Sequence, residues 1–359
     1  MKTAIFSLFA LLLNINVYSQ NNDYIYLKGH IDKHPITIIL NLSKEYDTEE
    51  TKFHGYYFYD SKQIPIELYE TYPEDSYNFA LSTFMFDEEE QEIFLGKFEN
   101  SVFKGKWKKN KHTLPFELKV PEKNNFVEMV KLENLRIVPI ITSENDDKVE
   151  GHFEFKFIVP KNPELQKELL SKVYEDFTDF NSYTNKKLDQ MANSYKEEIT
   201  TFYKDYGEIR PTFSYQYDQF ISPYLDTNEL LIMRYSNYEY TGGAHGLSLQ
   251  VFYNYDKINK KWLKIEDVLN ITKENEINKI LDKTLRKKYN LGPNDSYENA
   301  EGIVFLSDEI KLSHNFTLSK EGITFHYDLY EMTPYAYGYF NLLVPYEDLK
   351  PYLNKNFKL

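Results

Sequence analysis

A glycine-rich stretch around His245 is the first candidate for chemistry. The chain reads Tyr240-Thr241-Gly242-Gly243-Ala244-His245-Gly246 between two apolar, aromatic runs with the composition of strands. Glycines in such a region indicate backbone with positive φ or a close approach to another segment. The imidazole of His245 could act as an acid or base near neutral pH. The structural alternative is a tight hairpin in which His245 hydrogen-bonds the loop backbone.

His245 has no serine or cysteine beside it that it could activate. A partner carboxylate would have to come through the fold, and the candidates are Asp218, Asp226, Asp256, Asp267 and Glu331. Phosphate-binding loops, serine elbows, helical zinc motifs and dinucleotide fingerprints do not occur in the sequence. The sequence therefore predicts a non-enzymatic protein. The alternative is a hydrolase that uses His245 with a carboxylate supplied by the fold.

Two histidine–acid pairs have the spacing of metal ligands on a strand. His152 with Glu154, and His326 with Asp328, lie two residues apart, which places both side chains of a pair on one strand face. Each pair would still need a third ligand. We therefore interpret them as half-exposed strand residues and expect neither a metal site nor a cofactor. The acidic run Asp87–Glu90 lacks the pattern of a calcium loop and is predicted to be a solvated turn.

The second candidate for ligand binding consists of three tyrosines near the C-terminus, Tyr335, Tyr337 and Tyr339. Alternation would place them on one strand face, with Pro334 and Gly338 shaping its start. Exposed, such a row binds protein or sugar, whereas buried it belongs to the core. The candidate ligand-binding residues are Tyr240, Thr241, Gly242, Gly243, His245, Tyr335, Tyr337 and Tyr339.

Residues 24–118 read as an all-β domain because short apolar and aromatic runs alternate with Gly, Asn, Asp and Lys clusters. The spacing predicts an antiparallel meander closed into a small barrel or sandwich. The runs are Tyr24–Leu27, Ile36–Leu40, Gly55–Tyr59, Ile64–Leu68, Asn78–Phe86, Ile93–Phe98, Val102–Trp107 and Pro115–Leu118. The polar stretch Lys119–Asn125 is the predicted linker.

Beyond the linker, residues 126–359 mix strands with helical periodicity. Leu165, Leu169, Val173 and Phe177 recur every four residues, and a second apolar stripe begins at Leu188. Strand-like runs on either side of the glycine stretch and near the C-terminus indicate hairpins. We expect an α+β domain in which helices pack on an antiparallel sheet.

The N-terminus and the composition bear on location and partners. Residues 1–19 read as a signal peptide, with Lys2, an apolar run and a cut before Gln20. No later segment approaches the roughly 20 apolar residues of a membrane span. Without cysteine there is no lipid-modified cysteine, so we expect a periplasmic or secreted bacterial protein. A net charge of −14 disfavours nucleic acid and favours a basic partner.

Five motifs follow one another after about residue 150. They are the strand end Ile158-Val159-Pro160, the stretch 238–246, Tyr253-Asn254-Tyr255-Asp256, the run 262–269, and Pro334-Tyr335-Ala336-Tyr337-Gly338 before Val344-Pro345-Tyr346. This order of motifs resembles the extracytoplasmic domain of RsiV-type anti-sigma factors and of PdaC-type peptidoglycan deacetylases. The resemblance implies an α+β fold and, from the anti-sigma members, a domain that binds lysozyme. It includes neither a sigma-binding segment nor a deacetylase domain. The expected function is recognition of a basic wall-active protein such as lysozyme, or of cell-wall glycan.

Overall fold

The computed structural model describes residues 23–44, 51–73, 77–83, 90–121, 126–141 and 148–358. The predicted signal peptide, the acidic residues 87–89 and the linker residues 122–125 lie outside these ranges. The chain divides into two compact units. The first extends to Val127 and includes Pro223–Leu231 and Ser319–Glu321, and the second holds Glu128–Ser222, Ile232–Leu318 and Gly322–Leu359. In the described residues, no helix is long and apolar enough to cross a membrane.

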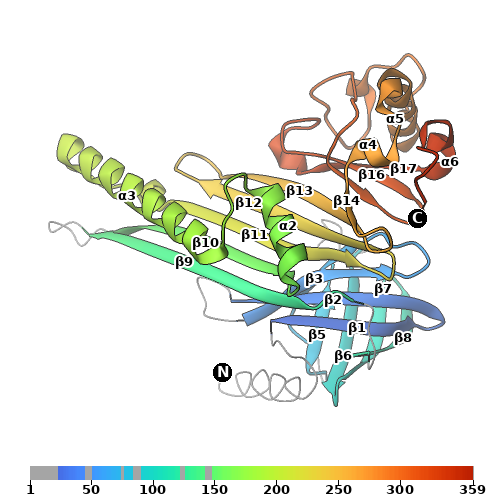
Figure 1. The fold of residues 1–359 in the computed structure, drawn as a ribbon, viewed down its shortest axis with the longest axis horizontal. Helices are drawn as coiled ribbons and strands as arrows, with labels where there is room; N and C mark the ends of the chain where they lie inside the picture. The colour runs from blue at the N-terminus through green and yellow to red at the C-terminus, as the bar shows by residue number, and fades with distance from the viewer. Residues whose placement is uncertain are drawn as a thin grey trace. The chain divides into compact units, whose positions relative to one another are not determined.

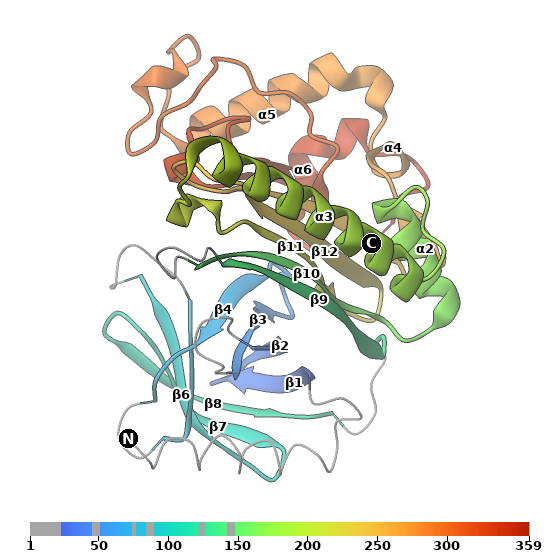
Figure 2. The same ribbon diagram turned by 90° about the vertical axis from the view of Figure 1, so that its left-hand side faces the viewer.

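The first unit contains a closed β-barrel in which each strand pairs with the next and β1 pairs antiparallel with β8 (Figure 2). Each of these strands overlaps one of the predicted apolar runs, so the all-β meander is confirmed and it forms a barrel. They are β1 Tyr24–Ile31, β2 His34–Lys44, β3 Thr51–Tyr59, β4 Ile66–Glu70, β5 Phe79–Ser82, β6 Glu92–Glu99, β7 Val102–Lys109 and β8 His112–Lys119.

Aromatic side chains fill the barrel. Tyr57, Phe94, Phe103 and Phe116 are fully buried in one apolar cluster, and Phe103 and Phe116 meet with ring centroids 4.6 Å apart. The strands approach closely at Gly105, where a Cβ would lie 2.0 Å from the carbonyl oxygen of Leu95. Packed side chains fill the interior of a small barrel of this kind, so the barrel has a hydrophobic core of its own.

The six-stranded sheet has the order β14-β13-β12-β11-β10-β9. Its strands are β9 Met129–Ile141, β10 Lys148–Pro160, β11 Gln216–Asp226, β12 Leu230–Tyr240, β13 Leu247–Asp256 and β14 Lys261–Leu263. The expectation of a purely antiparallel sheet is wrong at one place, because β10 and β11 are parallel. The physical reason is the connection between them. Between the two strands the chain passes through α2 Pro163–Val173 and α3 Phe180–Tyr206. A long helical crossover of this kind brings the chain back to the end of the sheet where β10 began, so that β11 runs in the same direction as β10.

Alternation on β10 decides which residues meet the helices. Phe153 packs on Tyr195 of α3 with ring centroids 6.0 Å apart, and Phe157 packs on Phe180 at 5.4 Å. Figure 1 shows α2 and α3 lying along this sheet. Because successive side chains of a strand point to opposite faces, His152 and Glu154 lie on the face away from α3.

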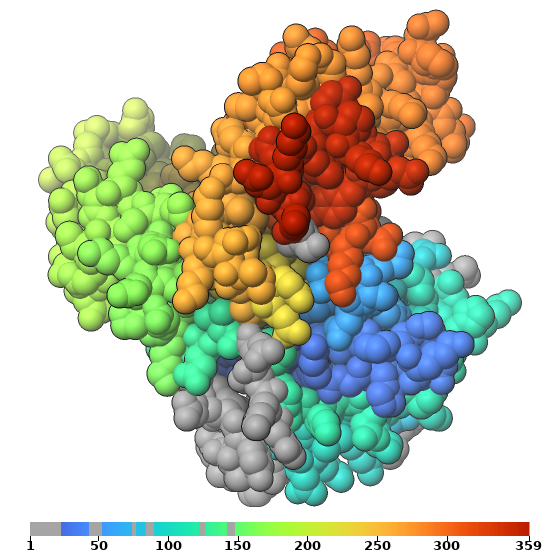
Figure 3. Space-filling model, turned by 45° about the vertical axis from the view of Figure 1, so that its right-hand side comes forward, coloured from blue at the N-terminus to red at the C-terminus, as the bar shows by residue number. Residues whose placement is uncertain are grey.

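The C-terminal part carries a three-stranded antiparallel sheet with the order β15-β16-β17. Its helices and strands are α4 Ile265–Val268, α5 Glu274–Lys288, β15 Phe316–Leu318, β16 Gly322–Tyr327, β17 Phe340–Pro345 and α6 Tyr346–Leu349. Short 3-10 helices are η1 Pro211–Phe213, η2 Ile271–Lys273, η3 Tyr297–Asn299, η4 Tyr335–Tyr337 and η5 Lys350–Tyr352. The buried face of α5 consists of Ile277, Leu281 and Leu285. Figure 3 shows the orange and red C-terminal segments packed against one another.

Candidate functional site

His245 lies in the connection between β12 and β13 and stacks on Tyr335. The ring centroids are 3.9 Å apart and the ring planes differ by 20°. His245 Nδ1 is 3.0 Å from the carbonyl oxygen of Gly246, and its Nε2 is 3.3 Å from the hydroxyl of Tyr330. A neutral imidazole that donates from Nδ1 and accepts at Nε2 satisfies both contacts. The structure thus brings together two of the residues that the sequence analysis selected.

The glycines of this connection have the predicted backbone. Gly242 and Gly243 have φ of 96° and 95°, which side chains with a Cβ rarely adopt. The hydroxyl of Tyr240 donates to the carbonyl oxygen of Gly243 at 3.1 Å. Thr241 and His245 are exposed. The hydrogen bond of His245 to a loop carbonyl is the structural alternative raised for this residue.

The expected strand through Tyr335, Tyr337 and Tyr339 is wrong. Residues 335–337 form η4 between Pro334 and Gly338, and β17 begins only at Phe340. Gly338 has φ 70°, and a turn of this kind interrupts the alternation that a shared face requires. Tyr339 is half-buried, and its hydroxyl donates to Ser248 Oγ at 2.7 Å.

Tyr330 and Tyr335 nevertheless contact His245, and Tyr337 follows two residues after Tyr335. Tyr330 is 49% exposed and Tyr337 is 44% exposed, and the rings of Tyr330 and Tyr335 are 5.9 Å apart. Tyr330, which no sequence pattern indicates as a site residue, has positive φ in the turn after β16. We call Tyr240, His245, Tyr330, Tyr335 and Tyr337 the tyrosine–histidine patch.

None of the five carboxylates proposed for His245 contacts it in the described parts of the chain. Asp218 lies beside His152, Asp226 accepts from the backbone of Val127, and Glu331 accepts from the backbone of Asp328. Asp256 accepts within its own turn, and Asp267 pairs with Lys261. Each of these carboxylates therefore has other partners, and within the described ranges His245 has no carboxylate beside it.

The pair His326 and Asp328 is structural. His326 is only 6% exposed, which corrects the half-exposed position expected for it. Its Nε2 lies 2.9 Å from Thr317 Oγ1 and its Nδ1 lies 2.7 Å from Asn341 Oδ1. Burial lowers the pKa of His326 to about 4. Asp328 accepts instead from the backbone of Gln250.

His152 is also less exposed than expected, whereas Glu154 is half-exposed as expected, and the pair has gained a third group. His152 is 7% exposed and Glu154 is half-buried. The parallel register of β10 and β11 places Asp218 directly opposite Glu154, and His152 Nε2 lies 3.6 Å from Asp218 Oδ1. This cluster depends on a strand pairing that no local pattern reveals.

Burial governs the electrostatics of the cluster His152, Glu154 and Asp218. It raises the pKa of Glu154 to about 7, an effect that the nearby charge of Lys156 opposes. It raises the pKa of Asp218 to about 6, although a hydrogen bond from the side chain of Gln216 opposes this shift. Burial therefore disfavours the charged form of both carboxylates.

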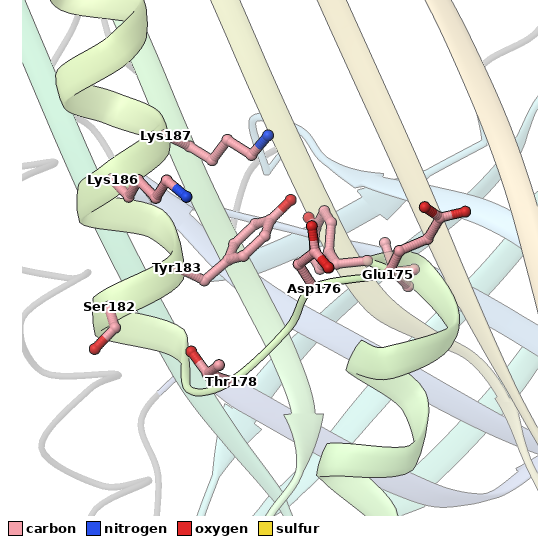
Figure 4. Close-up of a pocket in the computed structure, with 9 residues that line it drawn as sticks. Glu175, Asp176, Thr178, Ser182, Tyr183, Lys186 and Lys187 are labelled. Carbon is pink, nitrogen blue, oxygen red and sulfur yellow. The ribbon is translucent and has the colours of Figure 1, made fainter.

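A separate pocket of about 460 Å³ opens between the end of α2 and the first turns of α3 (Figure 4). Lys186 and Lys187 extend from α3, and Glu175 and Asp176 come from the segment after α2. Its two lysines and two carboxylates favour neither an anion nor a cation. It shares no residue with the tyrosine–histidine patch or with the His152 cluster.

Comparisons with known proteins point to one family of undetermined role. Residues 266–347 match the family described as "Protein of unknown function (DUF3298)". A crystal structure of a DUF3298 family member from Bacteroides fragilis has 23% identity and a TM-score of 0.55, covering 65% of this chain and 96% of that one. A DUF3298 family protein from Pseudomonas aeruginosa has 19% identity and a TM-score of 0.45, covering 64% and 95%. No curated protein matches. The chain is therefore similar to DUF3298 proteins over residues 266–347 and, over 65% of its length, shares a fold with the Bacteroides fragilis member.

Proposed function

We propose that this chain is an exported, non-enzymatic binding protein of the cell envelope and that the tyrosine–histidine patch is its ligand surface. The observation that carries the proposal is the stack of His245 on Tyr335 with Tyr330 alongside. These rings come from different segments and are held by contacts within the protein. Exposed aromatic side chains that are already ordered lose little entropy on binding and are frequent interface anchors.

Lysozyme, a basic wall-active protein, is the partner that we propose. The net charge of −14 would steer a basic protein toward the chain. Exposed Glu239 and Glu331 adjoin patch tyrosines in the sequence. The resemblance to RsiV-type receptors supports the same partner. Cell-wall glycan is the other ligand that aromatic rings of this kind could hold.

An enzymatic role has less support. Both ring nitrogens of His245 have partners in Gly246 and Tyr330, and general acid–base catalysis needs one nitrogen within reach of the substrate. The export part of the proposal rests on residues 1–19 as a signal peptide cleaved before Gln20. The intact mass of the protein from its native host tests the cleavage, and a retained Met1 would contradict it.

The binding experiment uses untagged mature protein and surface plasmon resonance against a basic lysozyme. We expect association to slow much more than dissociation speeds up as salt rises to physiological levels, where the Debye length is about 8 Å. Sedimentation with purified peptidoglycan is the parallel arm. Binding to peptidoglycan alone would replace lysozyme by glycan as the ligand. No binding in either arm at tens of micromolar protein would overturn the proposed function.

A further inference from the structure

His152, Glu154 and Asp218 present three potential ligand atoms to one point in the second unit. The atoms lie within 4.8 Å of one another, and His152 Nε2 is 3.6 Å from Asp218 Oδ1. Bonds of about 2.0–2.2 Å to a tetrahedral metal place its ligand atoms roughly 3.5 Å apart. From this geometry we propose that the three side chains bind one divalent transition-metal cation, with Zn²⁺ as its representative.

The buried oxygen of Asp218 is an independent observation that points to a ligand. Asp218 is 5% exposed, and its Oδ1 accepts no hydrogen bond. This oxygen is the atom that faces His152. A buried carboxylate oxygen without a donor carries a desolvation penalty, which makes such groups rare in folded proteins. A cation between Asp218, His152 and Glu154 would remove the penalty.

The donor set selects the class of cation. One imidazole and two carboxylates suit zinc and neighbouring transition metals, whereas calcium and magnesium prefer oxygen ligands throughout. Three protein ligands would leave a coordination position for water. The side chain of Gln216 donates to Asp218 Oδ2, and this hydrogen bond orients the carboxylate toward the proposed cation.

The surroundings of the cluster are compatible with a bound cation. Glu154 and Asp218 lie on hydrogen-bonded neighbouring strands, which holds their backbones in fixed register. The raised pKa values of both carboxylates indicate that burial disfavours two negative charges there, and a divalent cation would offset that cost. Two cationic groups oppose metal binding: Lys156, two residues along the same strand face, and Lys131 of β9, whose charge also acts on Glu154.

The test is a Zn²⁺ titration of untagged, chelator-treated mature protein by isothermal calorimetry. We expect one site, and at least tenfold weaker binding in Asp218→Asn and in Glu154→Gln, which keep the size of each side chain. His314→Gln is the control, because the side chain of His314 is 62% exposed beside Glu266. It should leave the affinity unchanged. Co²⁺ should give a visible absorption band in the parent protein that Glu154→Gln weakens.

Circular dichroism shows whether each variant is folded. If Asp218→Asn does not fold, the result for the half-buried Glu154→Gln decides. Absence of Zn²⁺ uptake by the parent, or equal affinity in the parent and Glu154→Gln, would overturn the metal site. An effect of His314→Gln as large as that of Glu154→Gln would identify the uptake as surface binding and would also overturn it. Lysozyme binding is measured separately, so failure of one proposal is distinguishable from failure of the other.

Discussion

His245 and Tyr335 stack with ring centroids 3.9 Å apart, although they come from the β12–β13 connection and from η4. The stack gives the tyrosine–histidine patch a fixed centre. Truncation of Tyr335 removes both its own contact area and the support of the His245 ring. We expect Tyr335→Ala to weaken lysozyme binding by about 2 kcal/mol or more, roughly 30-fold in Kd, measured by surface plasmon resonance.

The matched control for this prediction is Tyr206→Ala. Tyr206 is 69% exposed at the end of α3 and does not belong to the patch. Tyr206→Ala should leave the Kd for lysozyme unchanged. His245→Ala should weaken lysozyme binding while the protein stays folded. Equal losses in Tyr335→Ala and Tyr206→Ala would show that the patch has no special role.

Gly243 is expected to matter through its backbone. Its φ is 95°, and a Cβ there would meet no heavy atom within 4 Å, so the cost of substitution is conformational strain. Gly243→Val should destabilise the second unit by about 1–3 kcal/mol, measured by urea unfolding. Gly243→Asn should cost less because asparagine tolerates positive φ better. Equal midpoints for Gly243→Val and the parent would refute the strain.

The sequence predicted those parts of the fold that depend on neighbouring residues. The barrel strands follow from apolar runs punctuated by turn residues, and the positive φ of Gly242 and Gly243 follows from glycines in a β-rich region. The pairing of strands that lie far apart in the chain could not be predicted from the sequence. The parallel register of β10 and β11 depends on the crossover through α2 and α3, and no local pattern encodes it.

The same distinction applies to the site. The tyrosines of residues 335–339 alternate as they would in a strand. Residues 335–337 instead form a 3-10 turn between Pro334 and Gly338, so the alternation did not predict the backbone correctly. Tyr330 was missed because nothing in its neighbourhood indicates that it meets His245. Asp218 was considered only as a partner of His245, whereas the strand register places it beside Glu154. Long-range pairing, which the residues alone did not show, decides both assignments.

Glu92 is expected to be essential to the barrel. It is 7% exposed and accepts from Tyr57, from Trp107 Nε1 at 3.1 Å and from Lys109 Nζ at 3.2 Å. Glu92→Ala leaves the buried donors of Tyr57 and Trp107 without an acceptor. We expect a loss of about 2–4 kcal/mol of unfolding free energy, measured by urea unfolding with Trp fluorescence.

Glu117→Ala is the control for Glu92. Glu117 pairs with Lys104 on the barrel exterior, with side chains 47% and 69% exposed, and exposed ion pairs contribute little to stability. Its removal should leave the unfolding midpoint nearly unchanged. A Glu92→Ala midpoint equal to that of Glu117→Ala would show that the buried network is dispensable.

The last prediction concerns acid stability and His326. Burial lowers the pKa of this histidine from 6.5 to about 4, and it contacts Thr317, Asn341 and Phe252, which are uncharged. Between those two pH values the unfolded chain binds a proton at this residue that the folded chain does not. Stability from His326 is therefore fully present above pH 6.5 and is lost as the pH falls toward 4, by about 3 kcal/mol in total.

The variant His326→Gln isolates this contribution, because its side chain does not titrate. The raised pKa values of Glu154 and Asp218 act with the opposite sign, since their folded forms hold protons longer as the pH rises. The pH dependence of the parent's unfolding free energy is therefore the sum of contributions from several groups. The difference in this pH dependence between the parent and His326→Gln isolates the contribution of His326. Urea unfolding from pH 7 to pH 4 should show the parent losing more stability than the variant. Parallel curves would mean that His326 is protonated in the folded protein at its ordinary pKa.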